Sequence, residues 1–364
     1  MADVQTLVLA PPQPAPTTRR LGKLSAYFGT PGNSVVSVLS IAAIVFIAKF
    51  AFGWLVVDAV FSGNGETCKA ASGACWPFVA QKLRYMLFGF YPYDEQWRPM
   101  LALLLLFGAF LFSMMPRFWS RGLLLAWILV VLPVLYILMA GGVFGLTPVA
   151  TTSWGGLPLS FMLSFVGLTL AMPLGIVLAL ARASNLPAIR ILAVGFIEIV
   201  RGVPLISILF MATVMLPLFM PEGVTIDKLL RAQVAIILFA SAYIAEIVRG
   251  GLQDVPAGQY EAGSSLGLHY WQVMRKIVLP QALKKVIPPM VSLFIGFFQD
   301  TTLVTIVGLV DFLDTVRSAI RDPEWQGIAV LEGYLVAAAV YFTFSALMGA
   351  YSRFLEKHFR TTHA

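Results

Sequence analysis

Charged residues are scarce in this sequence of 364 residues. Asp, Glu, Lys and Arg make up 12% of it, whereas hydrophobic residues make up 59%, and the mean hydropathy is +0.84. A soluble domain carries about twice that share of charge, so the composition excludes a soluble protein and predicts an all-α, polytopic membrane protein. The net charge of +7 does not indicate nucleic-acid binding, because basic residues in such chains gather on the cytoplasmic side.

The residue patterns of common catalytic and metal sites are missing as well. The sequence has no Gly-x-x-x-x-Gly-Lys-Ser/Thr phosphate loop, so the chain does not hydrolyse ATP by that route. It holds three histidines and two cysteines, with no cluster at metal-ligand spacing and no Ser-His-Asp or paired-carboxylate arrangement. We therefore expect no enzyme activity, and no metal or cofactor bound by this chain.

Eight apolar runs are each long enough to cross roughly 30 Å of hydrocarbon, which needs about 20 residues. They lie near 35–57, 99–115, 122–140, 159–181, 189–219, 231–249, 287–308 and 331–353. The fifth run is long enough to be bent or broken at Gly202-Val203-Pro204. Placing the N-terminus in the cytoplasm puts most Lys and Arg on cytoplasmic loops, and it leaves both termini inside.

These runs predict three regions. Residues 1–34 are proline-rich and predict a cytoplasmic N-terminal tail. Residues 35–150 form a three-helix extension with a periplasmic loop at 58–98, and residues 151–364 form a five-helix core with a cytoplasmic loop at 250–286.

The periplasmic loop contains both cysteines, Cys68 and Cys75. In an oxidising compartment they could close a small disulfide loop, and two free thiols are the alternative. The stretch 78–90 that follows has apolar residues at helical spacing, and we expect it to lie along the membrane surface.

The longest polar interruption of the C-terminal half runs from 243 to 289. Gly267 favours a sharp turn between two short helices, the second of which Pro280 is expected to end or bend. Tyr270 and Trp271 near the turn offer rigid aromatic area for a partner. The regularly spaced anchors of the stretch are Glu261, Ala262, Gly263, Gly267, Ile277, Leu279 and Pro280.

That spacing resembles the EAA loop of permease subunits in ATP-binding-cassette (ABC) importers, with Gly263 at the usual third Ala. The stretch 196–205 is similar to the Ile-Glu-x-x-Arg-Gly-Thr-Pro-Leu signature of polar amino acid permeases, with Val203 replacing Thr. The stretch 299–304 resembles their Lys-Asp-Thr-Ser-Leu segment, with Gln299 replacing Lys. The resemblance covers about 150–355, and the additional spans look like those of the longer subunit of general L-amino acid importers in Gram-negative bacteria.

The resemblance implies a type I ABC importer permease in the bacterial inner membrane, acting in amino acid import. It implies a second, related permease subunit, two cytoplasmic ATPase subunits that use ATP and Mg²⁺, and a periplasmic amino-acid-binding protein. The anchors of the loop, together with Tyr270 and Trp271, would then couple the permease to the ATPases. The alternative is an ion-coupled secondary amino acid transporter or channel without an ATPase.

Five polar residues are candidates for the substrate path: Glu198, Arg201, Asp300, Thr301 and Thr302. Ionisable groups within spans usually face a protein interior or a water-filled cavity, and an amino acid needs both an acceptor for its ammonium and a donor for its carboxylate. Glu198 and Arg201 are three residues apart, so they share a helix face and can neutralise each other. A structural ion pair with a hydrogen-bonded Asp300 is an equally open interpretation.

Overall fold

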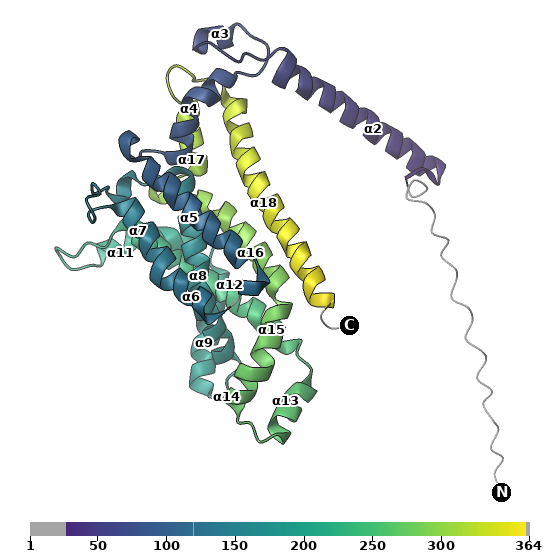
Figure 1. Ribbon diagram of the computed structural model, residues 1–364, viewed down its shortest axis with the longest axis vertical. Helices are drawn as coiled ribbons and strands as arrows, with labels where there is room; N and C mark the ends of the chain where they lie inside the picture. The colour runs from purple at the N-terminus through teal and green to yellow at the C-terminus, as the bar shows by residue number, and fades with distance from the viewer. Residues whose placement is uncertain (1–26, 119, 362–364) are drawn as a thin grey trace. The chain divides into compact units, whose positions relative to one another are not determined.

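The computed structural model describes residues 27–118 and 120–361 and is mainly helical (Figure 1). Most of the predicted tail 1–34 lies outside the described residues. The chain divides into two compact units. Unit 1 ends at Val60 and includes Ala70–Ala74, and unit 2 contains Phe61–Lys69 and all residues from Cys75 onward.

Unit 1 contains the first apolar helix, α2 (Pro31–Phe52), and its π-helical continuation η1 (Gly53–Val57). The Thr30 side chain accepts a hydrogen bond from the Asn33 N–H, and Pro31 suits the first turn, so the helix begins there. No side chain of α2 is buried. A helix that is apolar all round and unburied is suited to contact with lipid.

Unit 2 holds the other helices and one short strand. In chain order they are α3 (Gly65–Lys69), α4 (Trp76–Phe88), η2 (Tyr93–Glu95), α5 (Trp97–Ser113), η3 (Pro116–Phe118), α6 (Arg121–Ala126), η4 (Trp127–Val131), α7 (Leu132–Ala140), η5 (Thr151–Ser153), α8 (Gly156–Arg182), α9 (Pro187–Gly202), α10 (Leu205–Phe210), η6 (Met211–Met215), α11 (Leu216–Leu218), α12 (Lys228–Gln253), α13 (Ala257–Ser265), α14 (Tyr270–Val273), η7 (Met274–Val278), α15 (Leu279–Lys285), α16 (Ile287–Asp300), η8 (Thr301–Val307), β1 (Val310–Asp311), α17 (Phe312–Ile320) and α18 (Val330–Thr361).

Most of the predicted apolar runs are helices long enough to cross a membrane. Among the described residues they are Pro31–Val57, Tyr93–Ser113, Gly156–Arg182, Lys228–Gln253, Ile287–Val307 and Val330–Lys357. The shorter apolar helix Trp127–Ala140 coincides with the predicted run 122–140.

The remaining predicted run is a broken span. Pro187–Gly202 and Leu205–Leu218 together pass the same test and are bent by 102°, which confirms the break predicted at Gly202-Val203-Pro204. Val203 is extended, with φ −109° and ψ 134°, because a residue before proline is disfavoured in the helical region.

Helices α8 and α12 form the centre of unit 2, where many of their side chains are buried. The two helices approach closely at Gly175, where a Cβ would lie only 2.5 Å from Ile244 Cγ2. Small residues at such crossings allow tight packing between helices in a membrane.

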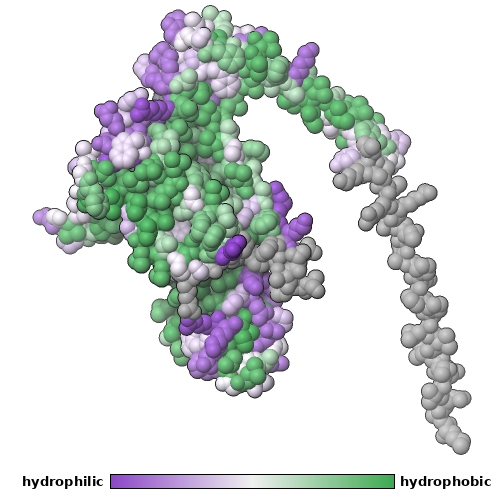
Figure 2. Space-filling model, viewed as in Figure 1, coloured by the Kyte–Doolittle hydropathy of each residue, from purple (hydrophilic) through white to green (hydrophobic). Residues whose placement is uncertain are grey.

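Helix α5 of the N-terminal extension packs against α8 and α16 through aromatic contacts. Phe107 and Phe110 of α5 pack edge-on against Phe161 and Phe165 of α8, with ring centroids 4.7 and 4.9 Å apart. Phe110 also stacks on Phe294 of α16 at 5.9 Å. In Figure 2, hydrophobic side chains dominate the α5–α7 side of unit 2.

Helix α4 covers most of the stretch 78–90, for which we predicted a position along the membrane surface, and that position stays a prediction. The helix packs against α17 and α18 because its apolar side chains are buried there: Phe78 and Met86 are fully enclosed, and the Phe78 ring lies 5.6 Å from that of Trp325. The Thr315 hydroxyl donates to the Met86 carbonyl over 2.6 Å. Helix α4 therefore packs together with α17 and α18, and we call these three helices the outer cap.

Polar contacts fasten the same cap. Lys82 Nζ donates to Asp322 Oδ2 over 2.6 Å, and this hydrogen bond lowers the pKa of Asp322. Cys68 and Cys75 form a disulfide with a Cα–Cα distance of 5.6 Å. The Cys75 N–H donates over 2.7 Å to the buried carboxylate of Glu332 at the start of α18.

Candidate functional site

The polar loop that follows α12 folds into two short helices joined at Gly267. Helix α13 ends in a Schellman motif, in which Leu268 N donates to Gly263 O (3.2 Å) and Gly267 N donates to Ser264 O (2.9 Å). Gly267 has a φ of +73°, a left-handed conformation that favours glycine. The predicted turn lies where the spacing placed it.

The second helical segment begins with a cap that the sequence pattern did not indicate. His269 Nδ1 accepts a hydrogen bond from Gln272 N, and the Gln272 side chain accepts one from His269 N, each over 3.2 Å. We predicted that Pro280 ends or bends this segment. The chain stays helical across Pro280, which lies in the first turn of α15 directly after the π-helical η7, so the predicted end is wrong and the bend stays a prediction. A first-turn position has no use for the N–H that proline lacks.

Gly263 differs from the usual Ala of the motif for a steric reason. A Cβ at this position would lie 2.8 Å from Val273 Cγ2 and 3.3 Å from Ile277 Cδ1. Glycine therefore lets α13 lie directly on α14 and η7. Because Gly263 is buried on the inner side, Glu261 and Ala262 are left exposed on the outer side of α13, while Ile277 and Leu279 are half-buried.

Gly263→Ala is expected to loosen this contact, although it restores the usual motif. Overpacking against a stiff Val costs about 1–3 kcal/mol and the gain in helix propensity returns about 1 kcal/mol, which leaves a net loss of about 1 kcal/mol. Hydrogen exchange of the 257–285 amides should become faster. The double variant Gly263→Ala/Val273→Ala should recover part of the protection, and equally fast exchange in both variants would contradict the steric explanation.

The outer end of the loop exposes large apolar side chains. Leu266, Tyr270 and Trp271 are 77%, 49% and 63% exposed, and the rings of Tyr270 and Trp271 pack edge-on with centroids 5.4 Å apart. We call these three residues the knob. Leu266 was not singled out from the sequence, although it lies directly beside Gly267. Exposed aromatic and apolar groups on a rigid base are suited to a partner's pocket.

The two ends of the loop, at the end of α12 and in α15, are joined by several contacts. Lys285 Nζ forms an ion pair with Asp254 Oδ2 at 2.7 Å and donates to the Asp254 carbonyl. At Gly251 the end of α12 lies so close to α15 that a Cβ would be 2.8 Å from the Ala282 carbonyl oxygen. Tyr260 Oη donates to the Leu252 carbonyl over 3.4 Å, and burial raises the pKa of Tyr260, which keeps it a neutral donor.

Two of the five path candidates belong to a charge network, but they are not paired with each other. Arg182 of α8 lies 2.8 Å from both Glu198 of α9 and Glu246 of α12. Glu246 also lies 2.8 Å from Arg249 and 3.6 Å from Arg201. The predicted Glu198–Arg201 pair is absent from the described residues because Arg182 reaches Glu198 first and Arg201 turns toward α12.

The network is a junction of three helices, and the part that Arg182 plays in it was not identified from the sequence. Arg182 is the last residue of α8, which looked like an ordinary cytoplasmic end. Glu246 has only 14% of its side chain exposed, against 55% for Glu198. The sequence did contain a signal for Glu246, because it lies three residues from Arg249 and the two can pair on one face of a helix.

The other three candidates lie together at the far end of α16. Thr301 is buried and donates to the Phe298 carbonyl over 2.8 Å, whereas Asp300 and Thr302 are half-buried. Gln299, which replaces the expected Lys, donates to Ser345 Oγ at 3.4 Å. No cation or hydrogen-bond donor in the described parts of the chain pairs with the Asp300 carboxylate, and no ion pair or hydrogen bond there joins these residues to the Glu246 network.

A buried acid fixes the chain just after this segment. η8 turns at Gly308, with φ +72°, and Asp311 then caps α17, accepting hydrogen bonds from Leu313 N and Asp314 N. Tyr341 Oη donates to the same carboxylate over 3.3 Å. Burial raises the pKa of Asp311 to about 6. These contacts hold the outer end of η8 against α17 and α18.

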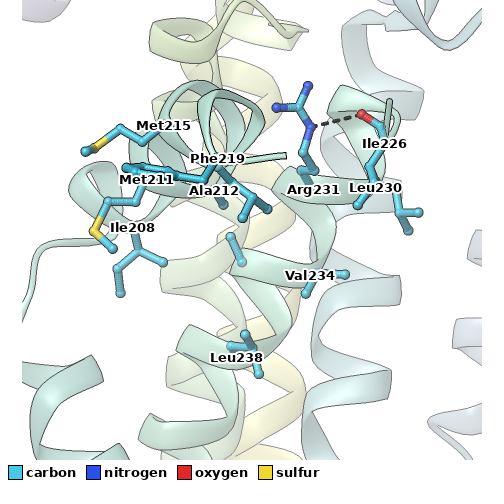
Figure 3. A pocket seen from close by; sticks show the side chains of 12 residues that line it. Ile208, Met211, Ala212, Met215, Phe219, Ile226, Leu230, Arg231, Val234 and Leu238 are labelled. Atoms are coloured by element: carbon cyan, nitrogen blue, oxygen red, sulfur yellow. Dashed lines mark hydrogen bonds between the residues drawn. The ribbon is translucent and has the colours of Figure 1, made fainter. Parts of the chain in front are cut away.

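A large apolar cavity lies apart from the five path candidates. It measures about 530 Å³ and lies between α10–α11 and α12 (Figure 3). Its polar group is Arg231, which donates from Nε to the Ile226 carbonyl over 3.0 Å and from its guanidinium to the Thr213 carbonyl. Because this guanidinium is already engaged and the other lining side chains are apolar, the cavity is a poor site for a charged amino acid.

Comparison with known families matches residues 171–361 to a family described as the inner membrane component of binding-protein-dependent transport systems. The chain is 46% identical over 339 residues to the inner membrane amino-acid ABC transporter permease protein YhdY of Escherichia coli, covering 92% of this chain and 91% of that protein. It is 35% identical over 431 residues to the glutamate/glutamine/aspartate/asparagine transport system permease protein BztC of Rhodobacter capsulatus, covering 99% and 98%.

A solved structure shares the fold of the C-terminal part. The crystal structure of an amino acid ABC transporter with histidines aligns with a TM-score of 0.50 and 30% sequence identity, over 56% of this chain and 92% of that one.

Proposed function

Because this chain belongs to the family of inner membrane components of binding-protein-dependent transport systems, we propose that its loop 257–285 couples ATP hydrolysis by partner subunits to amino acid import. The chain is a multi-pass permease subunit of the bacterial inner membrane, and its role is transport rather than catalysis. The proposal rests on one observation: the knob is exposed, and the Lys285–Asp254 ion pair joins the two ends of the loop that carries it.

The geometry supports a lever that runs from the knob to the path candidates. α14, η7 and α15 follow one another without a loop, α16 begins one residue after α15, and α16 ends at Asp300. A push on Tyr270 and Trp271 would be carried along η7 and α15, and then across the single turn residue Val286 into α16, which ends at Asp300. Such coupling is a population shift, in which ATP binds one state of the partner more tightly than the other.

Several partners follow from this proposal. We assign the knob to a pair of cytoplasmic ATPase subunits, which would bind ATP and Mg²⁺ themselves, and the opposite face to a periplasmic amino-acid-binding protein. A second, related permease subunit would complete the translocation path. The ion-coupled transporter considered from the sequence finds no support in the names of the relatives described above.

The test is a tagged purification from native membranes, with ATP hydrolysis measured in the purified material. We expect ATPase subunits to co-purify, and amino acid uptake into vesicles to require ATP and the binding protein. Uptake driven by an ion gradient alone, with no co-purifying ATPase under gentle conditions, would refute the proposal.

Asp300→Asn is expected to weaken amino acid uptake by the complete importer. We assign the Asp300 carboxylate to the substrate ammonium, and loss of a charged hydrogen bond costs about 1.5–3 kcal/mol, so KM should rise about tenfold or more. Glu222→Gln is the matched control, because it removes a negative charge from the exposed segment between α11 and α12. An unchanged KM at equal protein levels would remove Asp300 from the path.

A further inference from the structure

A cavity that contains three arginines lies at the inner ends of the spans, beside the coupling loop. It measures about 780 Å³ and is bordered by the ends of α8 and α12, the first half of α9, and α13. Three arginines from three helices line it, Arg182, Arg190 and Arg249, and Glu261 is the acidic residue that lines it. The proposed transport function does not account for this concentration of guanidinium groups.

The three arginines are not equally engaged. Arg182 and Arg249 are paired with Glu246, each at 2.8 Å. Arg190 donates from Nε to the Ser184 carbonyl over 2.9 Å, and no carboxylate in the described chain lies within ion-pair distance of it. Its two terminal nitrogens therefore remain available as a fork, the geometry that suits bidentate binding of a phosphate group.

The surroundings of Arg190 favour an anion at the membrane boundary. α9 begins at Pro187, so Arg190 lies in its first turn, where the helix dipole favours negative charge. On the same helix Ile191 and Leu192 are 69% and 74% exposed. Exposed apolar side chains beside a charged pocket are typical of a helix at the membrane interface.

From this arrangement we propose that the cavity binds a phosphate group through Arg190, beside Arg182 and Arg249, whose charges are shared with Glu246. The phosphate belongs to a phospholipid headgroup at the inner surface of the membrane or to a free phosphate ion, since both present the same oxygens. The apolar flank of α9 would then contact the acyl chains when a lipid is bound. Basic pockets at the cytoplasmic ends of spans recognise anionic headgroups in this way.

The experiment uses the purified full-length chain in detergent and native mass spectrometry. The probes, in separate arms, are phosphatidylglycerol, phosphatidylcholine and inorganic phosphate. We expect phosphatidylglycerol to bind, Arg190→Gln to weaken it about tenfold, and Arg190→Lys to recover part of the loss. The matched control is Arg275→Gln, which removes an exposed arginine of the same polar loop and should change the affinity less than twofold.

The arms also identify the source of the phosphate. Binding of phosphatidylglycerol that millimolar inorganic phosphate cannot displace assigns the site to lipid, and binding of inorganic phosphate alone assigns it to the free ion. Equal losses in Arg190→Gln and Arg275→Gln would reduce the effect to general surface charge and overturn the proposal. Loss of co-purifying ATPase in Arg190→Gln, with lipid and phosphate binding intact, would show a protein partner at Arg190 and overturn it too.

Discussion

Replacing Gly267 by valine is expected to detach the ATPase subunits from the permease. Gly267 adopts a φ of +73°, and no neighbouring atom lies within 4 Å of the place where a Cβ would stand, so a side chain has room and the cost is conformational. The left-handed region costs an L-residue about 1–2 kcal/mol, and a β-branched residue is a true outlier there. The turn should therefore rearrange and displace Tyr270 and Trp271 from their docking position.

The measurement is ATP hydrolysis retained after tagged purification, which should fall at least tenfold in Gly267→Val. Gly267→Asn is the matched control, because asparagine tolerates the left-handed region, and it should retain most of the activity. If both variants kept the ATPase subunits, the angle between the two short helices would not matter for docking. If both lost them, the docking surface rather than the turn would be at fault.

Glu246→Gln is expected to destabilise the protein more than the loss of any other acid in this charge network. It removes the carboxylate that lies near Arg182, Arg201 and Arg249 and leaves three guanidinium groups of the junction facing one another. Glu246 is half-buried and its partners are partly exposed, and loss of a hydrogen bond to a charged group costs about 1.5–3 kcal/mol. Thermal unfolding of the full-length protein in detergent should show a clear drop in Tm.

Glu198→Gln tests the same network at its exposed edge. Glu198 is paired with Arg182 alone among the described residues and has 55% of its side chain exposed, and exposed pairs contribute about 0–1 kcal/mol. Its Tm should therefore stay close to that of the unaltered protein. Equal Tm losses in the two variants would mean that Glu246 is not the centre of the junction.

Features that depend on neighbouring residues could be predicted from the sequence. Gly267 indicates a turn, because the turn needs a residue with positive φ. Pro204 indicates the break between α9 and α10, because it disfavours the helical conformation at Val203. For Pro280 we predicted an end or a bend; the end is wrong, since the chain stays helical from η7 into α15 across it, and the bend stays a prediction.

Features that depend on distant partners could not be predicted. Phe78 and Met86 show helical spacing, but nothing local reveals that Trp325 and Thr315 cover them. The choice of Arg182 rather than Arg201 as the partner of Glu198 likewise depends on how α8 and α9 cross. Gly263 departs from the motif for a reason that only the positions of Val273 and Ile277 reveal, because they leave no room for a methyl group.

The outer cap has a consequence for how the chain is made. Its contacts join residues far apart in the sequence: Cys75 with Glu332, Lys82 with Asp322, and Met86 with Thr315. The ribosome completes α4 long before α17 and α18, so the part of α4 that packs on these two helices stays uncovered until they have been made. Closure of the cap therefore requires synthesis of the whole chain, and a protein truncated before α17 would lack the contacts of Phe78 with Trp325 and of Met86 with Thr315.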